Sequence, residues 1–192
     1  ARAASTFASR LPSEYATSPG ATPKFVLLSS AAVSRPGWGP AEREAYAEAF
    51  DIPIVGLNPG GILETKSAGE EALRSSGAPY AIVRPCGLND NLEAGRIVLS
   101  CGDVAVGRIS RANLAELLVS VLSEPAALSK TFEALTVEGP KASLAESFAK
   151  LPKDGEAGAP APTLEAFNAL RALAPVAGQM INGVPPPGAS TP

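Results

Sequence analysis

The residues of this chain best placed to do chemistry follow one short apolar strand, together with a lysine on the helix before it. Lys66 lies eleven residues ahead of Gly77, and the strand at residues 80–83 then stops at the sequence Arg-Pro-Cys-Gly, residues 84–87. In an α/β sheet such a stop is the carboxyl end of a parallel strand, where ligands bind. The spacing therefore predicts a ligand site at this end of the sheet, with Lys66 close to it.

The elements that must position this site can be read from the apolar pattern. Residues 24–30 form a continuous apolar run that ends in Ser29 and Ser30, and a run without alternation is typical of a strand buried on both faces. Residues 62–75 contain good helix formers, with Gly77 as the expected stop signal. The order strand, helix, strand predicts a parallel crossover unit.

The rest of the chain is less regular. We expect a short helix at residues 41–50, a connection at 51–61, and a hairpin over 95–106 around Cys101-Gly102-Asp103. A helix should start at Ser110, and a last strand should cover residues 131–137. The apolar face expected for the helix is made by Leu114, Leu117, Leu118, Val121 and Leu122.

These elements predict an α/β fold, a partial Rossmann-like parallel sheet with crossover helices and irregular N- and C-terminal arms. The expected divisions are an arm at 1–23, a half Rossmann-like domain at 24–139, and a Pro/Ala-rich linker, short helix and tail at 140–192. The helix at 163–174 has an apolar stripe, and we expect this helix and the tail through Pro192 to dock on another subunit. The alternative is that it folds back to cover the sheet edge.

Composition excludes several function classes. The chain has no histidine, which removes the commonest general base, the Ser-His-Asp triad and most zinc sites, so no metal site is expected. Cys86 and Cys101 are fifteen residues apart without a CxxC pattern. Free thiols are the favoured interpretation and a disulfide is the alternative. Cys86 is not expected to be a nucleophile, because no base accompanies it.

Charge and hydropathy bear on possible partners. The net charge is −3 and the pI is near 5.1, without a basic run, so no nucleic-acid partner is expected. No stretch reaches the roughly 18–20 apolar residues of a transmembrane helix. Residues 1–10 carry Arg2 and Arg10 among hydroxyl residues and no acid, which resembles the end of a transit peptide. Because the chain starts at Ala1, we expect a processed or incomplete product.

Four segments in this order resemble the C-terminal half of atypical short-chain dehydrogenases/reductases. They are residues 24–33, 66–87, 107–118 and 131–137. Within that family the chain is most similar to plastid and cyanobacterial members that act in photosystem biogenesis. In some of these a complex I intermediate-associated (CIA) type domain interrupts the fold. The resemblance implies a missing front half, and the sequence accordingly contains no glycine-rich phosphate-binding fingerprint.

The resemblance also assigns roles to the site residues. Active members carry a Tyr-x-x-x-Lys pair, in which the lysine holds the ribose and lowers the pKa of the proton-donating tyrosine. Lys66 fits the lysine, but Ile62 stands where the tyrosine would be. The cofactor-contacting positions that the resemblance implies, in vestigial form, are Ser29, Ser30, Lys66, Pro85, Cys86 and Gly87. The alternatives are a solvated lysine, hydroxyls that bind loop backbone, and a rigid strand exit at the proline.

These observations favour a non-catalytic, dehydrogenase-like scaffold subunit or assembly factor of a plastid photosynthetic membrane complex, peripheral to the thylakoid. No NAD(P) is expected on this chain alone, because no loop supplies the amides that a pyrophosphate needs. The enzyme alternative is an NAD(P)-dependent reductase or epimerase whose glycine-rich half is supplied elsewhere. A third hypothesis is a small α/β binding module for an unrelated partner.

Overall fold

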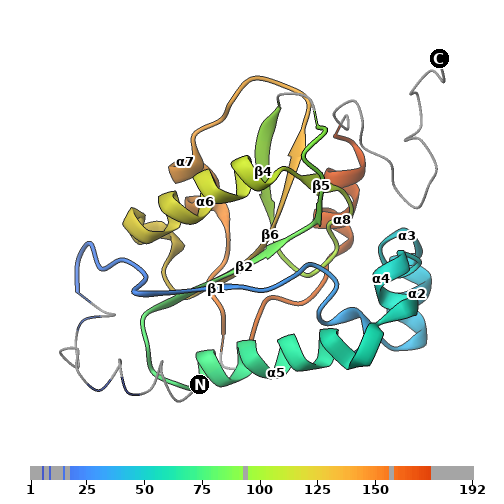
Figure 1. Ribbon diagram of the computed structural model, residues 1–192, viewed down its shortest axis with the longest axis horizontal. Coiled ribbons are helices and arrows are strands. Elements are labelled where there is room, and N and C mark those ends of the chain that lie inside the picture. The colour runs from blue at the N-terminus through green and yellow to red at the C-terminus, as the bar shows by residue number, and fades with distance from the viewer. Residues whose placement is uncertain are drawn as a thin grey trace.

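The centre of the protein is a four-stranded, mostly parallel sheet. We describe it from a computed structural model, which describes residues 6, 9, 15, 18–92, 95–155 and 158–173. The strand order is β1-β2-β6-β4, and only β4 runs antiparallel (Figure 1). The strands are β1 (Phe25–Leu28), β2 (Tyr80–Pro85), β6 (Lys130–Val137) and β4 (Arg96–Ser100). This is the α/β, Rossmann-like architecture that the sequence predicts.

The predicted crossover unit is confirmed. Strand β1 pairs parallel with β2, with Phe25 opposite Tyr80 and Leu28 opposite Val83. Helix α5 (Ile62–Arg74) connects them and carries Lys66. The chain leaves the helix through Gly77, whose φ of +73° is readily adopted only by glycine.

Helices cover both faces of the sheet (Figure 1). Alternate residues of β2 point to opposite sides, so Ile82 packs with Leu73 of α5, whereas Val83 packs on the other face. That other face is covered by α6 (Arg111–Ser123) and α7 (Leu144–Lys150). Because β2 is buried along its whole length, its apolar run shows no alternation.

Helix α6 begins as predicted. The Ser110 hydroxyl accepts a hydrogen bond from the Asn113 backbone N–H at 3.1 Å, which caps the first turn. Leu114, Leu117 and Val121 are buried, and Leu118 packs against the same core. Leu122, which we placed on that face, is 52% exposed. The helix therefore buries a narrower stripe than its apolar residues indicate.

The predicted hairpin over residues 95–106 is wrong. Residues 104–106 form no strand that could pair with β4. Strand β4 instead pairs antiparallel with β6, at the edge of the parallel strands. The chain turns at Gly102 and Asp103, and a short strand β5 (Arg108–Ile109) then pairs parallel with β3 (Gly87–Leu88). The second sheet of two strands thus lies directly after β2.

The segment between β1 and α5 is more helical than predicted. The expected helix at 41–50 is broken at Tyr46 into α2 (Pro40–Ala45) and α3 (Ala47–Phe50). The expected connection at 51–61 contains α4 (Pro53–Leu57). A proline in the first turn is compatible with a helix, so Pro53 starts α4 rather than preventing it. The 3-10 turns are η2 (Arg35–Gly37), η3 (Pro59–Gly61) and η4 (Pro125–Ala127).

Helix α8 (Leu164–Arg171) packs on this domain through its apolar face. This differs from our expectation that the face docks on another subunit. Phe167 is buried against Tyr46, with the rings edge to face and 5.4 Å between centroids. The segment before α8 crosses Gly102 closely, where an added Cβ would lie 2.8 Å from the Pro162 Cα. The tail at 174–192 and most of the arm at 1–23 lie outside the described residues, and the domain boundaries stay predictions.

Replacing Phe167 by alanine is expected to lower the free energy of unfolding by about 3 kcal/mol, because a buried aromatic side chain leaves a cavity. Leu164 on the same helix is 56% exposed, and its replacement by alanine should cost less than about 1 kcal/mol. Urea denaturation of both variants measures the difference. Equal, small losses would show that α8 does not belong to the stable core.

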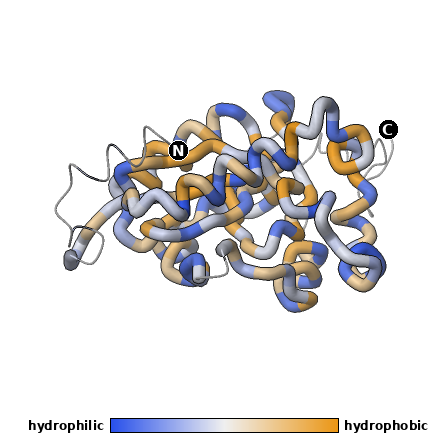
Figure 2. The backbone as a smooth tube through the Cα atoms, turned by 90° about the horizontal axis from the view of Figure 1, so that it is seen from below, coloured by the Kyte–Doolittle hydropathy of each residue, from blue (hydrophilic) through white to orange (hydrophobic). Residues whose placement is uncertain are grey.

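Within the described residues, no helix combines the length and the apolarity needed to cross a membrane. Figure 2 shows hydrophilic and hydrophobic residues alternating over short stretches of the backbone.

Candidate functional site

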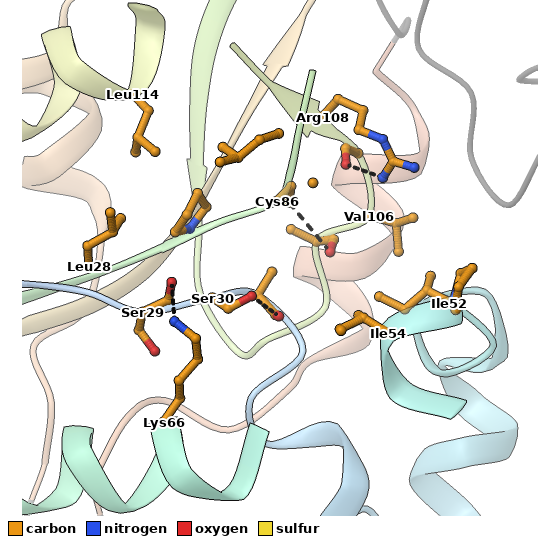
Figure 3. A pocket seen from close by; sticks show the side chains of 17 residues that line it. Leu28, Ser29, Ser30, Ile52, Ile54, Lys66, Cys86, Val106, Arg108 and Leu114 are labelled. Atoms are coloured by element: carbon orange, nitrogen blue, oxygen red, sulfur yellow. Dashed lines mark hydrogen bonds between the residues drawn. The ribbon is translucent and has the colours of Figure 1, made fainter. Parts of the chain in front are cut away.

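A cavity of about 600 Å³ opens at the carboxyl ends of β1 and β2 (Figure 3). All six residues singled out in the sequence line it, namely Ser29, Ser30, Lys66, Pro85, Cys86 and Gly87. They come from two strand ends and from α5, and the parallel β1–β2 pairing brings those strand ends to the same edge. The cavity has the size of a small-molecule site.

Lys66 reaches toward the end of β1. Its Nζ donates a hydrogen bond to the Ser29 carbonyl at 3.3 Å, and the side chain is half-buried. Ile62 lies one turn earlier on α5 and is 41% exposed. The Ser30 hydroxyl donates to the Ala31 carbonyl at 3.0 Å, which is the backbone role that the sequence left open for it.

The end of β2 is held rigidly. The Cys86 backbone N–H donates to the Ala134 carbonyl at 2.9 Å, and the Cys86 thiol contacts the Ala105 carbonyl at 3.7 Å. Burial raises the pKa of Cys86 to about 12, so the group stays a thiol at neutral pH. Cys86 and Cys101 are both free, as the favoured interpretation predicted.

Sequence reasoning missed Arg108, the second charged residue of the cavity. Its Nη1 donates to the Gly107 carbonyl at 3.2 Å, and β5 places it beside Gly87. A Cβ on Gly87 would collide with the Arg108 guanidinium, so a larger residue there would displace the Arg108 side chain. Residues 107–118 contributed to the family resemblance, but no spacing rule connects position 108 to position 87.

The far wall of the cavity, residues 105–107, is positioned by Arg35, which begins the 3-10 turn η2 after β1. Arg35 is fully buried and donates through Nε to the Asp103 carbonyl and through Nη2 to the Ala105 carbonyl, each at 2.7 Å. Its Nη1 donates to the Ala49 carbonyl. The Asp103 carboxylate accepts from Ala32 N–H at 2.7 Å, so the segment after β1 and the wall are joined.

Helix α5 is fixed on the sheet by a buried ion pair one turn after Lys66. Arg84 on β2 donates to both carboxylate oxygens of Glu70, at 2.9 and 2.7 Å. Burial alone would raise the pKa of Glu70, but the hydrogen bond and charge of Arg84 outweigh it and hold the pKa below its ordinary value. The paired geometry is the strong form of a charge-assisted hydrogen bond, and it joins α5, the helix that carries Lys66, to β2.

Glu133 on β6 is paired in register with Arg84 on β2. It accepts a hydrogen bond from the Asp103 backbone N–H at 3.0 Å. Burial, followed by the nearby Asp103 charge, raises the pKa of Glu133 to about 7, although Arg84 and Arg35 act in the opposite direction. The native protein therefore holds a proton here that the unfolded chain releases at lower pH.

This proton predicts a stability that decreases as pH rises. With a folded pKa near 7 and an unfolded value of 4.5, the stabilisation is complete below about pH 4.5 and is lost toward pH 7. Glu133→Gln should remove that slope and be more stable than the parent at pH 8 by about 2 kcal/mol. Denaturant unfolding between pH 5 and 8 tests this, with exposed Glu116→Gln as the control. Parallel pH profiles for the parent and Glu133→Gln would contradict it.

The chain is similar to known proteins in sequence and in fold. A model of the NAD(P)H-binding family matches residues 17–125. An uncharacterized chloroplastic protein of Arabidopsis thaliana is 33% identical over 130 residues, which cover 67% of this chain and 44% of that protein. The chain thus spans less than half the length of this relative.

Among solved structures, the oxidoreductase ylbE of Lactococcus lactis is similar at 17% identity and a TM-score of 0.49, over 67% of this chain and 52% of that one. A short-chain dehydrogenase/reductase (wide type) of Veillonella parvula in complex with NADP is 17% identical, with a TM-score of 0.40, over 59% of this chain and 50% of that one.

Proposed function

The chain belongs to the NAD(P)H-binding family, and on this premise we propose that it is a non-catalytic, dehydrogenase-like subunit or assembly factor of a plastid photosynthetic membrane complex. The fold is Rossmann-like, with a ligand cavity at the carboxyl edge of its parallel strands. The resemblance to photosystem-biogenesis members, some split by a CIA-type domain, supports the choice of complex.

The observation that carries the proposal is the cavity itself, which has a lysine but no phenol. Ile62 lies one turn before Lys66, and its side chain cannot transfer a proton. The chain has three tyrosines, and none of them lines the cavity. Tyr46 is buried in the aromatic cluster beside α8, and the Tyr80 hydroxyl donates to Asp154 at 2.9 Å.

A plastid location is supported by the chloroplastic relative. We propose a position peripheral to the thylakoid, held by subunits of the complex. For the cofactor we propose that this chain alone does not bind NAD(P) tightly. The sequence supplies no glycine-rich loop, and dinucleotide pyrophosphate requires several backbone amides at a helix N-terminus.

One observation favours the enzyme alternative, a reductase or epimerase whose glycine-rich half is supplied elsewhere. The six residues that the family resemblance selects meet in one cavity, although they come from three separate elements. Such an arrangement would suit the nicotinamide side of a dinucleotide site, completed by the other half of the fold.

The two possibilities separate in a direct experiment. The purified parent protein and the Ile62→Tyr variant are each mixed with NADPH. Binding is measured by calorimetry, and NADPH oxidation is measured by the loss of its absorbance. We expect no turnover by the parent and no tight binding. Native gels of plastid membranes should show the protein migrating with a photosynthetic complex. NADPH turnover by the parent protein would refute the non-catalytic assignment, and migration only as a free protein would refute the partner.

A further inference from the structure

We propose that the cavity binds an organic acid with an apolar body, and that Arg108 is the residue that recognises its acidic group. This inference rests on the proposal that the cavity is the ligand site of the protein, and it names the chemical class of the ligand. It follows from the charges of the cavity, the position of Arg108 and the nature of the walls between the charged ends.

The cavity has an uncompensated positive charge. Among the residues that the structure describes, Lys66 and Arg108 are the charged residues that line it, and no aspartate or glutamate does. Among the described residues, neither cation forms an ion pair. The buried arginines elsewhere differ, since Arg84 is paired with Glu70 and Arg35 lies near Asp103. An anion is therefore the ligand that would complete the charge balance.

Arg108 has donors to spare. A guanidinium carries five N–H groups, and the bond to the Gly107 carbonyl uses one of them. The side chain is half-buried and lies across Gly87, where the missing Cβ makes room for it. Strand pairing between β3 and β5 fixes both residues in register. The guanidinium is thus preorganised, which lowers the entropic cost of binding a carboxylate, sulfonate or phosphate.

Lys66 and Arg108 lie on opposite sides of the cavity, and apolar side chains from several elements form other parts of its lining (Figure 3). Ile52 and Ile54 come from the α4 region, Leu114 from α6 and Leu28 from β1. Ile54 and Leu28 also have exposed surface at the cavity. These walls favour burial of an apolar body. Backbone N–H groups of the lining residues Ser29, Ala31, Cys86 and Gly87 already donate to carbonyls, so a polyphosphate would find few donors for its oxygens.

A matched pair of fluorescent probes tests the inference. The anionic probe is 8-anilinonaphthalene-1-sulfonate, and the neutral probe is N-phenyl-1-naphthylamine, which has the same ring system without the sulfonate. Both are titrated into the parent protein, Arg108→Met and Arg111→Met. Arg111 is the matched control, because its side chain is 64% exposed and pairs with Asp90 outside the cavity. The melting temperature of each variant checks the fold.

We expect the parent protein to bind the anionic probe about tenfold more tightly than the neutral one. Arg108→Met should remove this preference and leave the affinity for the neutral probe within about twofold, because methionine keeps an apolar stem. Arg111→Met should change neither value. Unchanged binding of the sulfonate by Arg108→Met, or equal loss of both probes, would overturn the assignment of Arg108.

Competition separates this inference from the function proposed above. NADPH should not displace the anionic probe, and displacement at micromolar NADPH would overturn the apolar organic acid in favour of a nucleotide phosphate. NADPH oxidation by the protein would instead refute the non-catalytic function and leave the Arg108 result standing. If the parent protein shows no preference for the anionic probe and does not oxidise NADPH, only the ligand class is refuted.

Discussion

Replacing Arg35 by methionine is expected to lower the free energy of unfolding by about 4 kcal/mol, or to prevent folding altogether. The guanidinium is fully buried and donates to the carbonyls of Ala49, Asp103 and Ala105. Without it, three buried acceptors lose their donor, and each such loss costs about 1–3 kcal/mol. The Asp103 carboxylate also loses a nearby cation, at 3.8 Å. A loss of about 4 kcal/mol is a large part of the free energy of unfolding of an ordinary domain.

A second variant keeps the expectation measurable. Arg35→Lys retains the charge but has one ammonium for three separated carbonyls, so we expect a loss of about 2 kcal/mol. Arg111→Met serves as the surface control and should cost less than about 1 kcal/mol. Chemical denaturation gives the three values, and hydrogen exchange of residues 103–107 should accelerate in Arg35→Lys. A loss below about 1 kcal/mol for Arg35→Met would show that the wall does not depend on this side chain.

The second large effect is expected at the ion pair that fixes α5. Glu70→Gln should lower the free energy of unfolding by about 3–5 kcal/mol, because it leaves the Arg84 charge buried without its carboxylate. The neighbouring Glu71 provides a matched control. Its side chain is 66% exposed and pairs with Arg74 at 3.6 Å, so Glu71→Gln should cost less than about 1 kcal/mol.

The pH dependence of Glu70→Gln gives a further check of the cause. A folded pKa held below the ordinary value stabilises the protein above the unfolded pKa near 4.5, and this contribution is lost as pH falls through the folded pKa. The difference between parent and Glu70→Gln should therefore be complete at pH 7 and shrink below about pH 4. Calorimetric unfolding between pH 3 and 7 measures it. A difference that does not change with pH would attribute the loss to packing rather than to charge.

The sequence predicts the parallel core because its signals are local. Residues 24–30 and 80–83 are continuous apolar runs, and the helix between them ends before a glycine with positive φ. The structure confirms these as β1, β2 and α5. Because carboxyl ends of parallel strands share one edge, Ser29 and Cys86 were expected near each other, and both line the cavity.

Signals that depend on competing partners were less reliable. Strand β4 has an apolar pattern, but that pattern does not say whether it pairs with the next segment or with β6. Phe167 and Leu170 show a helix with an apolar stripe, but the stripe alone does not distinguish a fold-back helix from one that binds a partner. In both cases the packing partner depends on which surface the rest of the fold leaves uncovered.

What the sequence by itself determined is the crossover unit, the set of residues at its strand ends, and the absence of a phenol one turn before Lys66. Only the tertiary structure decided that Arg108 lies across Gly87, that Arg35 joins α3 to Asp103 and to the first residue of the cavity wall, Ala105, and that α8 covers this domain. The physical reason is the separation, along the sequence, of the residues that make contact. Helix and strand patterns arise from neighbours in the chain, whereas these contacts join segments from 14 to 68 or more residues apart, and their energy depends on burial that the fold must first create.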